Sequence, residues 1–272
     1  MLPIVRDPCM SQATVIIINI ISADSQTPPR ISSEADLHLP RILCLHGGGT
    51  NPWIFRTQCR SISASLKGHF RLIFAEAPFI AVPGPDVESV YAEWGPFRSW
   101  VRPDTAGRMP VCWGPGSVDV EAIDLAISNA IEADDRAGAT GRVAGLLGFS
   151  QGAKMAACLL FRQQEENARQ NKPMDTTPKV EYRFAVLLAG RGPLVALDNP
   201  GRDDILRLPT IHVHGTRDPG LHLHRELLHH HCAKGSAKLI EWNGNHRVPI
   251  NARDVMPIVD AILDTARTIW LM

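Results

Sequence analysis

The segment GLLGFSQGAK, residues 145–154, places one hydroxyl-bearing residue, Ser150, between Gly148 and Gly152 directly after an apolar run. A strand that turns abruptly into a helix needs small residues on both sides of the turn, and the side chain at its apex then points outward. This G-x-S-x-G arrangement is the nucleophile elbow, which exposes a serine oxygen at the carboxyl end of a parallel sheet. Ser150 is therefore the candidate nucleophile, and other segments must supply the groups that activate it.

A serine hydroxyl becomes a useful nucleophile when a base takes its proton and a carboxylate holds that base in the right tautomer. In chains with this elbow the three groups follow the order Ser, Asp, His, each after a strand. The segment PTIHVHGTRDPG (209–220) places Asp218 just beyond an expected strand, and LIEWNGNHRVP (239–249) places His246 just beyond the next one. We expect His246 to be the base and Asp218 the acid.

Acyl transfer through a serine also develops negative charge on the carbonyl oxygen, which backbone N–H groups can stabilise. Gln151 begins the expected helix after the elbow, so its N–H lies at a helix N-terminus. The segment LCLHGGGTN (43–51) follows the first expected strand, and its glycines let the backbone approach a substrate oxygen closely. We expect Gln151 and Gly48, with Gly49 as the next choice, to form the oxyanion hole, and His46 to hold the glycine loop.

Other titratable residues near these motifs have structural explanations. Asp203 and Asp204 precede a strand and are expected to be surface charges, whereas His212 and His214 lie within the strand and are expected in the core. The segment HLHRELLHHHC (222–232) raises the question of a metal site, but three adjacent histidines cannot share one helical face and no paired ligand motif accompanies them. We therefore expect neither a metal ion nor a cofactor.

Composition limits the classes of partner and compartment. Lys and Arg together number 28, as do Asp and Glu, so the formal net charge is zero and a nucleic-acid partner is not expected. The six cysteines lie far apart without C-x-x-C spacing, which favours reduced thiols in a cytoplasmic protein. No apolar run has the length of a membrane span, so no membrane association is expected either.

The pattern along the chain predicts an α/β fold. Short apolar runs, each typical of a buried strand, alternate with longer amphipathic segments from residue 40 onward. Such alternation indicates a mostly parallel sheet with helices on both faces. The expected strands are 41–47, 70–78, 142–150, 183–190, 209–215 and 237–244, and the expected helices are 118–135, 152–170 and 254–269.

The N-terminal residues 1–38 stand apart from a single domain expected over residues 39–272. Their apolar stretch 13–22 predicts an extra edge strand or a poorly ordered extension. The alternative is the apolar core of a signal peptide, which is disfavoured because Asp7 offsets Arg6 and a basic flank is missing.

Residues 80–117, called the insertion below, interrupt the alternation with a Pro- and Gly-rich stretch that has no sustained period. A loop of this length inside a compact domain is usually functional or disordered, and its aromatic content argues against disorder. We expect its aromatic side chains to line an apolar slot for a substrate, the alternative being that they pin the loop to the core. These side chains are Trp94, Phe97, Trp100 and Trp113.

Five blocks together resemble the fungal and animal serine hydrolase family often called FSH, a branch of the α/β-hydrolase superfamily. These blocks are LCLHGGGTNPWIFRTQ, FAEAPF, GLLGFSQGA, VHGTRDPG and GNHRVP, in the family's order, from about residue 40 to the C-terminus. The resemblance implies an α/β-hydrolase fold, with the nucleophile on Ser150, the acid on Asp218 and the base on His246. It also implies that the insertion is the family's variable segment near the active site.

Within this family the chain is most similar to fungal members encoded beside polyketide synthases. That resemblance implies a thioesterase that releases a polyketide acyl chain from the acyl carrier domain of the synthase. One alternative is a carboxylesterase that acts on small-molecule esters in secondary metabolism with the same catalytic groups. Another is an α/β-hydrolase scaffold that only binds ligands, which the intact triad and glycine loop disfavour.

A carrier partner would require a basic spot, because carrier domains are acidic and their phosphopantetheine arm bears a phosphate. Arginine suits phosphate because its guanidinium donates through a fork of N–H groups. The insertion contains three candidates for this contact, and the alternative is that they only solvate the loop. They are Arg98, Arg102 and Arg108.

Overall fold

The structure, a computed structural model, describes residues 36–84, 86–110, 113, 117–169, 179–197 and 204–270. The expectations for the N-terminal extension up to residue 35, including the stretch 13–22, and for Asp203 lie outside these residues. Within the described ranges, no helix has both the length and the apolar character that crossing a bilayer requires.

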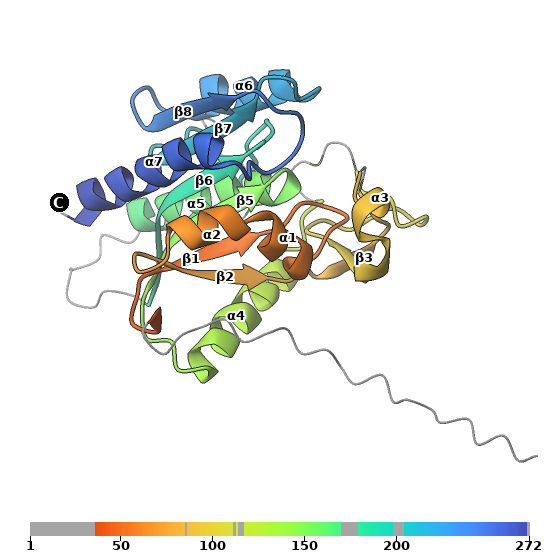
Figure 1. The fold of residues 1–272 in the computed structure, drawn as a ribbon, viewed down its shortest axis with the longest axis horizontal. Helices are drawn as coiled ribbons and strands as arrows, with labels where there is room; N and C mark the ends of the chain where they lie inside the picture. Colours follow the sequence, from red (N-terminus) through yellow and green to blue (C-terminus); the bar gives the residue numbers. More distant parts are fainter. Residues whose placement is uncertain are drawn as a thin grey trace, which may run out of the picture. The chain divides into compact units, whose positions relative to one another are not determined.

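A six-stranded sheet in the order β2-β1-β5-β6-β7-β8 forms the centre of the described domain (Figure 1). Every neighbouring pair of strands is parallel. The strands are β1 (Arg41–Leu45), β2 (Arg71–Ala75), β5 (Val143–Phe149), β6 (Val180–Leu188), β7 (Thr210–Gly215) and β8 (Ala237–Trp242). Each lies within one of the six predicted strand segments or overlaps it, so the predicted parallel sheet is confirmed.

Helices cover both faces of the sheet, as predicted (Figure 1). Alternate residues of each strand serve the two faces: in β6, Ala185 and Leu187 pack toward α4 and α5, whereas Val186 and Leu188 pack toward α7. The first group of helices is α4 (Val120–Arg136), α5 (Gln151–Arg169) and α6 (Leu221–His231), and the second is α1 (Pro52–Gln58), α2 (Arg60–Ser65) and α7 (Ala252–Trp270).

The predicted helical face of α4 illustrates how the sequence sets these elements. Asp119 caps the helix by accepting a hydrogen bond from the backbone N–H of Ala122 at 3.0 Å. Ile123, Ile127 and Ile131 then repeat at helical spacing and are all buried against the sheet. The apolar period and the cap together fix where α4 begins and which side it buries.

The insertion contains more regular structure than its sequence predicts. Two short strands, β3 (Phe79–Ala81) and β4 (Phe97–Ser99), pair antiparallel, and α3 (Glu88–Tyr91) and the single turn η2 (Ala92–Trp94) lie between them. Strands of three residues are too short to show an alternating pattern. The insertion is tied to the glycine loop, because Arg98 N donates to the Thr50 carbonyl at 2.7 Å.

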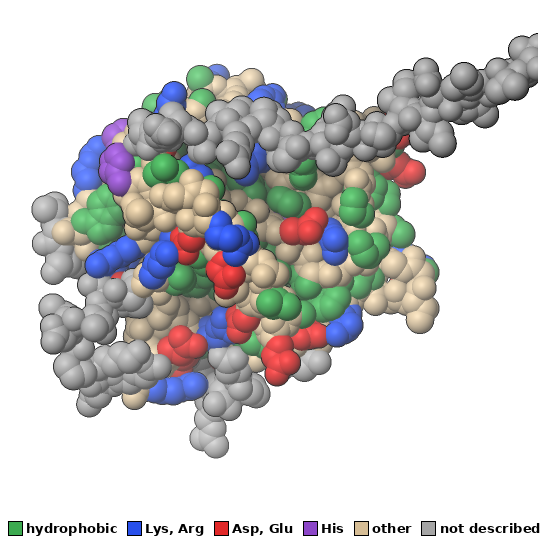
Figure 2. All heavy atoms as spheres, turned by 90° about the horizontal axis from the view of Figure 1, so that it is seen from below, with side chains coloured by type: hydrophobic (Ala, Val, Ile, Leu, Met, Phe, Trp, Pro, Cys, Tyr) green, Lys and Arg blue, Asp and Glu red, His purple; other side chains and the backbone are tan. Residues whose placement is uncertain are grey.

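Charged side chains of both signs are interspersed on the face of the molecule shown in Figure 2. Opposite charges also pair between helices, for example Arg162 of α5 with Asp124 of α4 at 2.6 Å. On the described part of that face, no extended patch of one sign is present, in keeping with the formal net charge of zero.

Candidate active site

Ser150 is the one residue between the end of β5 and the start of α5, and its backbone φ is 52°. This is the left-handed region, which side chains other than glycine rarely adopt and which costs about 1–2 kcal/mol. The turn is held by the Ser150 N–H, which donates to the Leu188 carbonyl at 2.9 Å. A strained serine at a strand-to-helix turn is the geometry that the motif predicted.

The two glycines of the elbow are required by close backbone contacts. A Cβ atom at Gly152 would overlap the carbonyl oxygens of Leu45 and His46 at the end of β1. A Cβ atom at Gly148 would overlap the carbonyl oxygen of Gly152. Only glycine at both positions therefore lets α5 begin directly beside β1.

Ser150, His246 and Asp218 form one hydrogen-bonded row. His246 follows β8, and its Nε2 lies 2.9 Å from the Ser150 Oγ. Its Nδ1 lies 2.6 Å from Oδ2 of Asp218, which follows β7. Because an ionised carboxylate only accepts hydrogen bonds, Nδ1 carries the proton and Nε2 is free to accept the serine hydroxyl.

The Asp218 carboxylate is buried yet ionised. Burial, the largest single influence, raises its pKa, but hydrogen bonds from His246 and from the Gly220 N–H, together with nearby His224, lower the pKa to about 2. The Gly220 N–H donates to Oδ1 at 2.8 Å. At neutral pH the carboxylate is therefore charged and can orient His246.

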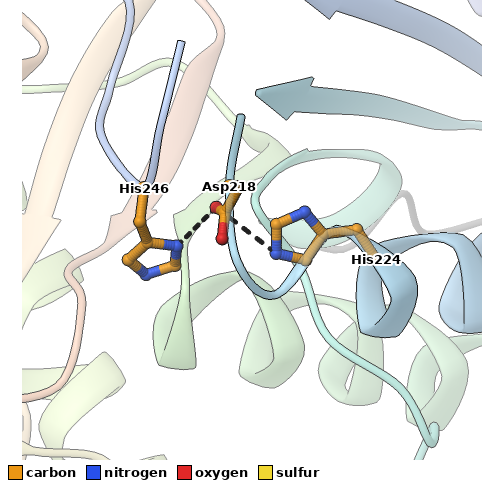
Figure 3. A group of neighbouring side chains, drawn as sticks. All are labelled: Asp218, His224 and His246. Atoms are coloured by element: carbon orange, nitrogen blue, oxygen red, sulfur yellow. Dashed lines mark hydrogen bonds and ion pairs between the residues drawn. The ribbon is translucent and has the colours of Figure 1, made fainter. Parts of the chain in front are cut away.

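A second histidine lies against the same carboxylate, and the sequence did not single it out. His224 of α6 places its Nε2 3.6 Å from Oδ2 of Asp218, so that Asp218 lies between two imidazole rings (Figure 3). In the sequence, the segment 222–232 raises only the question of a metal site. The available signal was helical spacing, since His224 and Leu227 share the buried side of α6.

These three side chains also have the spacing of a metal site, with one ligand atom from each lying within 4.8 Å of the others. A zinc ion holds its ligands at about 2 Å in a tetrahedron, which separates the ligand atoms by about 3.3 Å. The His246–Asp218 distance of 2.6 Å is shorter than that and is explained by a direct hydrogen bond. The geometry therefore fits a proton between these two residues better than a metal ion.

Gln151 and Gly48 lie side by side at the elbow. As the first residue of α5, Gln151 has an N–H without a partner inside the helix. Its side chain ties α5 to the insertion, because Oε1 accepts from the Trp100 N–H at 2.8 Å. A Cβ atom at Gly48 would lie 3.1 Å from this side chain, and among the described residues the Gly48 N–H has no hydrogen-bond acceptor.

Gly49, the second choice for the oxyanion hole, does not supply a free donor. Its N–H donates to the Arg98 carbonyl at 2.8 Å and is therefore already engaged. Gly49 instead provides the turn, with a φ of +68° and no room for a Cβ atom against Gly84. This correction leaves Gly48 as the candidate of the glycine loop.

His46 holds the glycine loop, as expected. Its Nε2 accepts from the Ala77 N–H at 3.1 Å, and its Nδ1 donates to the Gly47 carbonyl at 2.8 Å. Burial lowers its pKa to about 4, so the ring is neutral at neutral pH. The Trp100 indole N–H donates to the His46 carbonyl at 2.8 Å and fixes the loop from the insertion side.

Of the four aromatic residues predicted to line a substrate slot, two belong to the core. Trp100 is fully buried, and Trp113 is 7% exposed with its carbonyl accepting from Lys154 Nζ at 3.0 Å. Neither ring is accessible to a substrate, because both belong to the buried apolar cluster formed by the sheet, α4 and α5. Trp94 is 42% exposed and Phe97 is half-buried, so these two remain candidates for substrate contact.

The three arginines predicted to contact a carrier all have carboxylate partners. Arg98 is also the least exposed of them, and its backbone holds the glycine loop. Arg102 and Arg108 are 67% and 75% exposed at the side chain. The pairs are Arg98–Glu76 at 3.5 Å, Arg102–Asp119 at 2.5 Å and Arg108–Asp104 at 2.8 Å.

His212 and His214 are fully buried, which confirms their predicted place in the core, whereas Asp204 is half-buried rather than on the surface. A cavity of about 360 Å³ lies at the amino ends of β5 and β6, the opposite end of the sheet from Ser150, and is not part of this site. Its lining includes His38, Pro40, Arg142, Glu181, Arg183 and Trp270.

Comparisons with known proteins agree with this geometry. The family described as "Serine hydrolase (FSH1)" matches residues 36–258. The chain is 49% identical over 263 residues to "Esterase pigG" of Monascus ruber, covering 87% of this chain and 95% of that one. It is 52% identical over 258 residues to a "Probable esterase" of Aspergillus terreus, covering 88% and 96%.

A solved structure shows the same fold at low sequence identity. The Zea mays acyl-protein thioesterase 2 aligns with a TM-score of 0.50 and 16% identity, covering 84% of this chain and 94% of that chain. At this identity the likeness concerns the α/β-hydrolase fold alone.

Proposed function

The chain belongs to the serine hydrolase family, and from that premise we propose that Ser150, His246 and Asp218 cleave an acyl ester or thioester through a covalent acyl-enzyme. The observation that carries the proposal is the row Ser150–His246–Asp218, with contacts of 2.9 and 2.6 Å at the carboxyl ends of β5, β8 and β7. Similarity to esterases over nearly the whole length of the chain supports the same class of reaction.

In the first half-reaction, the Ser150 oxygen attacks the acyl carbonyl while its proton passes to Nε2 of His246. The ionised Asp218 stabilises the resulting imidazolium through the Nδ1–H bond. The N–H groups of Gly48 and Gln151 stabilise the negative charge on the carbonyl oxygen. The bond to the leaving group then breaks, and the alcohol or thiol leaves with the proton from His246.

In the second half-reaction, water replaces the leaving group. His246 takes a proton from the water, whose oxygen attacks the carbonyl of the acyl-Ser150 ester. The tetrahedral intermediate collapses, the serine oxygen recovers a proton from His246, and a carboxylic acid is released. The side chains named here supply every proton transfer that this cycle requires.

For the natural substrate we propose a polyketide acyl chain bound as a thioester to an acyl carrier domain. The proposal is supported by the resemblance of the five sequence blocks to fungal members encoded beside polyketide synthases. Trp94 and Phe97 offer apolar contact for the acyl chain, and exposed Arg102 and Arg108 lie in the same insertion. Small-molecule esters are the alternative substrates, since the same catalytic groups cleave both.

Replacing the nucleophile tests the proposed chemistry. The variant Ser150→Ala is expected to lose covalent labelling by a fluorophosphonate and to lose at least about a thousandfold in turnover, because the triad acts as a unit. Circular dichroism and thermal unfolding should show that the variant is folded. Turnover retained by the folded Ser150→Ala variant would rule out the assignment.

Comparing two substrates of the same acyl group tests the proposed partner. The double variant Arg102→Ala/Arg108→Ala is expected to lower kcat/KM for the carrier-bound thioester, with a loss that shrinks as ionic strength rises. Hydrolysis of a small neutral ester should be unchanged. Arg136→Ala is the matched control, because Arg136 is 70% exposed and is paired with Glu132 on α4. Equal losses on both substrates would show that the arginines only support the fold.

A further inference from the structure

The catalytic acid has a second buried imidazole against it, and the mechanism above does not use that group. His224 is fully buried on α6 and places its Nε2 3.6 Å from Oδ2 of Asp218. The same oxygen lies 2.6 Å from Nδ1 of His246. In Figure 3 the two rings lie on opposite sides of the carboxylate and both point a nitrogen toward it.

The protonation state of His224 follows from its surroundings. Burial, the largest influence, lowers its pKa to about 3 even though the Asp218 charge raises it, so the ring is neutral at neutral pH. Asp218 is ionised and can only accept hydrogen bonds. The hydrogen is therefore assigned to the Nε2 that faces the carboxylate. At 3.6 Å this contact is longer than a hydrogen bond, and among the described residues neither ring nitrogen of His224 has a hydrogen-bond partner.

Groups from several elements face His224 and hold its ring in place. The ring of His214 on β7 lies 5.4 Å from that of His224, and the ring of His246 lies at 6.3 Å. Arg191, which follows β6, adds a positive charge nearby that lowers the pKa of His224 further. Among the described residues, Asp218 is thus the one negatively charged group that acts on the ring.

We propose that His224 is a positioning residue for the proposed reaction, holding Oδ2 of Asp218 in line with Nδ1 of His246. This inference rests on the function proposed above. The Nε2–H dipole withdraws charge from the oxygen that His246 also uses, so the shared proton stays on His246. The Gly220 N–H donates to the other carboxylate oxygen, and this hydrogen bond and the His224 dipole together orient the acid.

The test compares His224→Phe with His224→Gln, which keeps an N–H donor near the position of Nε2. In His224→Phe, Asp218 loses this dipole and stabilises the His246 imidazolium more strongly. The acid limb of the pH profile of kcat/KM should therefore move upward by about half a pH unit. We expect kcat to fall about tenfold with KM little changed, and His224→Gln to recover part of both effects.

His212→Phe is the matched control, because His212 on β7 is as fully buried as His224 and its Nε2 contacts Thr210 at 3.2 Å. It should leave the pH profile in place. The inference would be overturned if His224→Phe left the pH profile of kcat/KM and kcat unchanged. It would also be overturned if His212→Phe had equal effects. Fluorophosphonate labelling of the unaltered protein is measured in parallel, so that failure of the proposed function is recognised separately as a missing label at Ser150.

Discussion

At the residue scale, the candidate site depends on a carboxylate that has neighbours at both of its oxygens. Asp218 accepts from His246 on Oδ2 and from the Gly220 N–H on Oδ1, with His224 beside Oδ2. An acid held this firmly selects one tautomer of His246, with the hydrogen on Nδ1 and the lone pair facing Ser150. Changing its chemistry without changing its shape should therefore have a large effect on the reaction alone.

The variant Asp218→Asn tests this dependence. The new amide can donate to Nδ1 of His246, which shifts the ring hydrogen to Nε2. A protonated Nε2 can no longer accept the proton of Ser150. We expect kcat to fall about ten-thousandfold while thermal unfolding changes little. Asp204→Asn, at a half-buried aspartate that precedes β7, is the comparison. A larger loss in Asp204→Asn than in Asp218→Asn would show that the acid is misassigned.

The sequence predicted part of this site because motif spacing reports on backbone geometry. The elbow around Ser150 and the positions of Asp218 and His246 after successive strands follow from local patterns. The sequence did not predict that Trp100 lies in the core or that the Gly49 N–H already donates a hydrogen bond. Both depend on hydrogen bonds between segments far apart in the chain. His224 is a different case, because its place is set locally: it lies shortly after Asp218, on the buried side of α6.

At the element scale, the sheet was predictable and several short helices were not. Apolar runs marked all six strands, and those of β1 and β5 are continuous because these strands are buried on both faces. The edge strand β8 contains Lys238 and Glu241 and is largely exposed. The helix α1 does carry a start signal in its sequence: Asn51 accepts from the Ile54 N–H at 3.0 Å, and Pro52 begins the helix. The strands of the insertion are too short to show a period in the sequence.

The junction of β5 and α5 gives a prediction about stability. In Gly152→Ala, the new methyl group would overlap the Leu45 and His46 carbonyls, so α5 must move away from β1. We expect a loss of more than about 2 kcal/mol in the free energy of unfolding by urea, together with a loss of turnover. Gly95→Ala is the control, because its nearest contact would be an ordinary 3.6 Å from Phe97. Equal stability of the two variants would contradict the close packing at the elbow.

At the scale of the whole molecule, the domain carries an unusual number of buried neutral histidines. Burial lowers the pKa of His46 and His214 to about 4 and that of His212 and His224 to about 3. In the unfolded chain each would titrate near the ordinary value of 6.5. At a pH between the folded-state and the unfolded-state pKa, the unfolded chain binds protons that the folded chain does not. The free energy of unfolding must therefore rise with pH across this range.

The free energy of unfolding should therefore fall as the pH is lowered from about 6.5 to 4. Well below pH 6.5, each buried histidine lowers the free energy of unfolding by about 1.4 kcal/mol for every pH unit of acidification. The four together give a slope that corresponds to the uptake of up to about four protons on unfolding. Urea unfolding at closely spaced pH values measures this slope. His212→Phe should lower it by about one proton, whereas His230→Phe, at an exposed position of α6, should leave it unchanged. A stability that stays flat from pH 6.5 to 4 would show that these histidines become protonated within the folded protein.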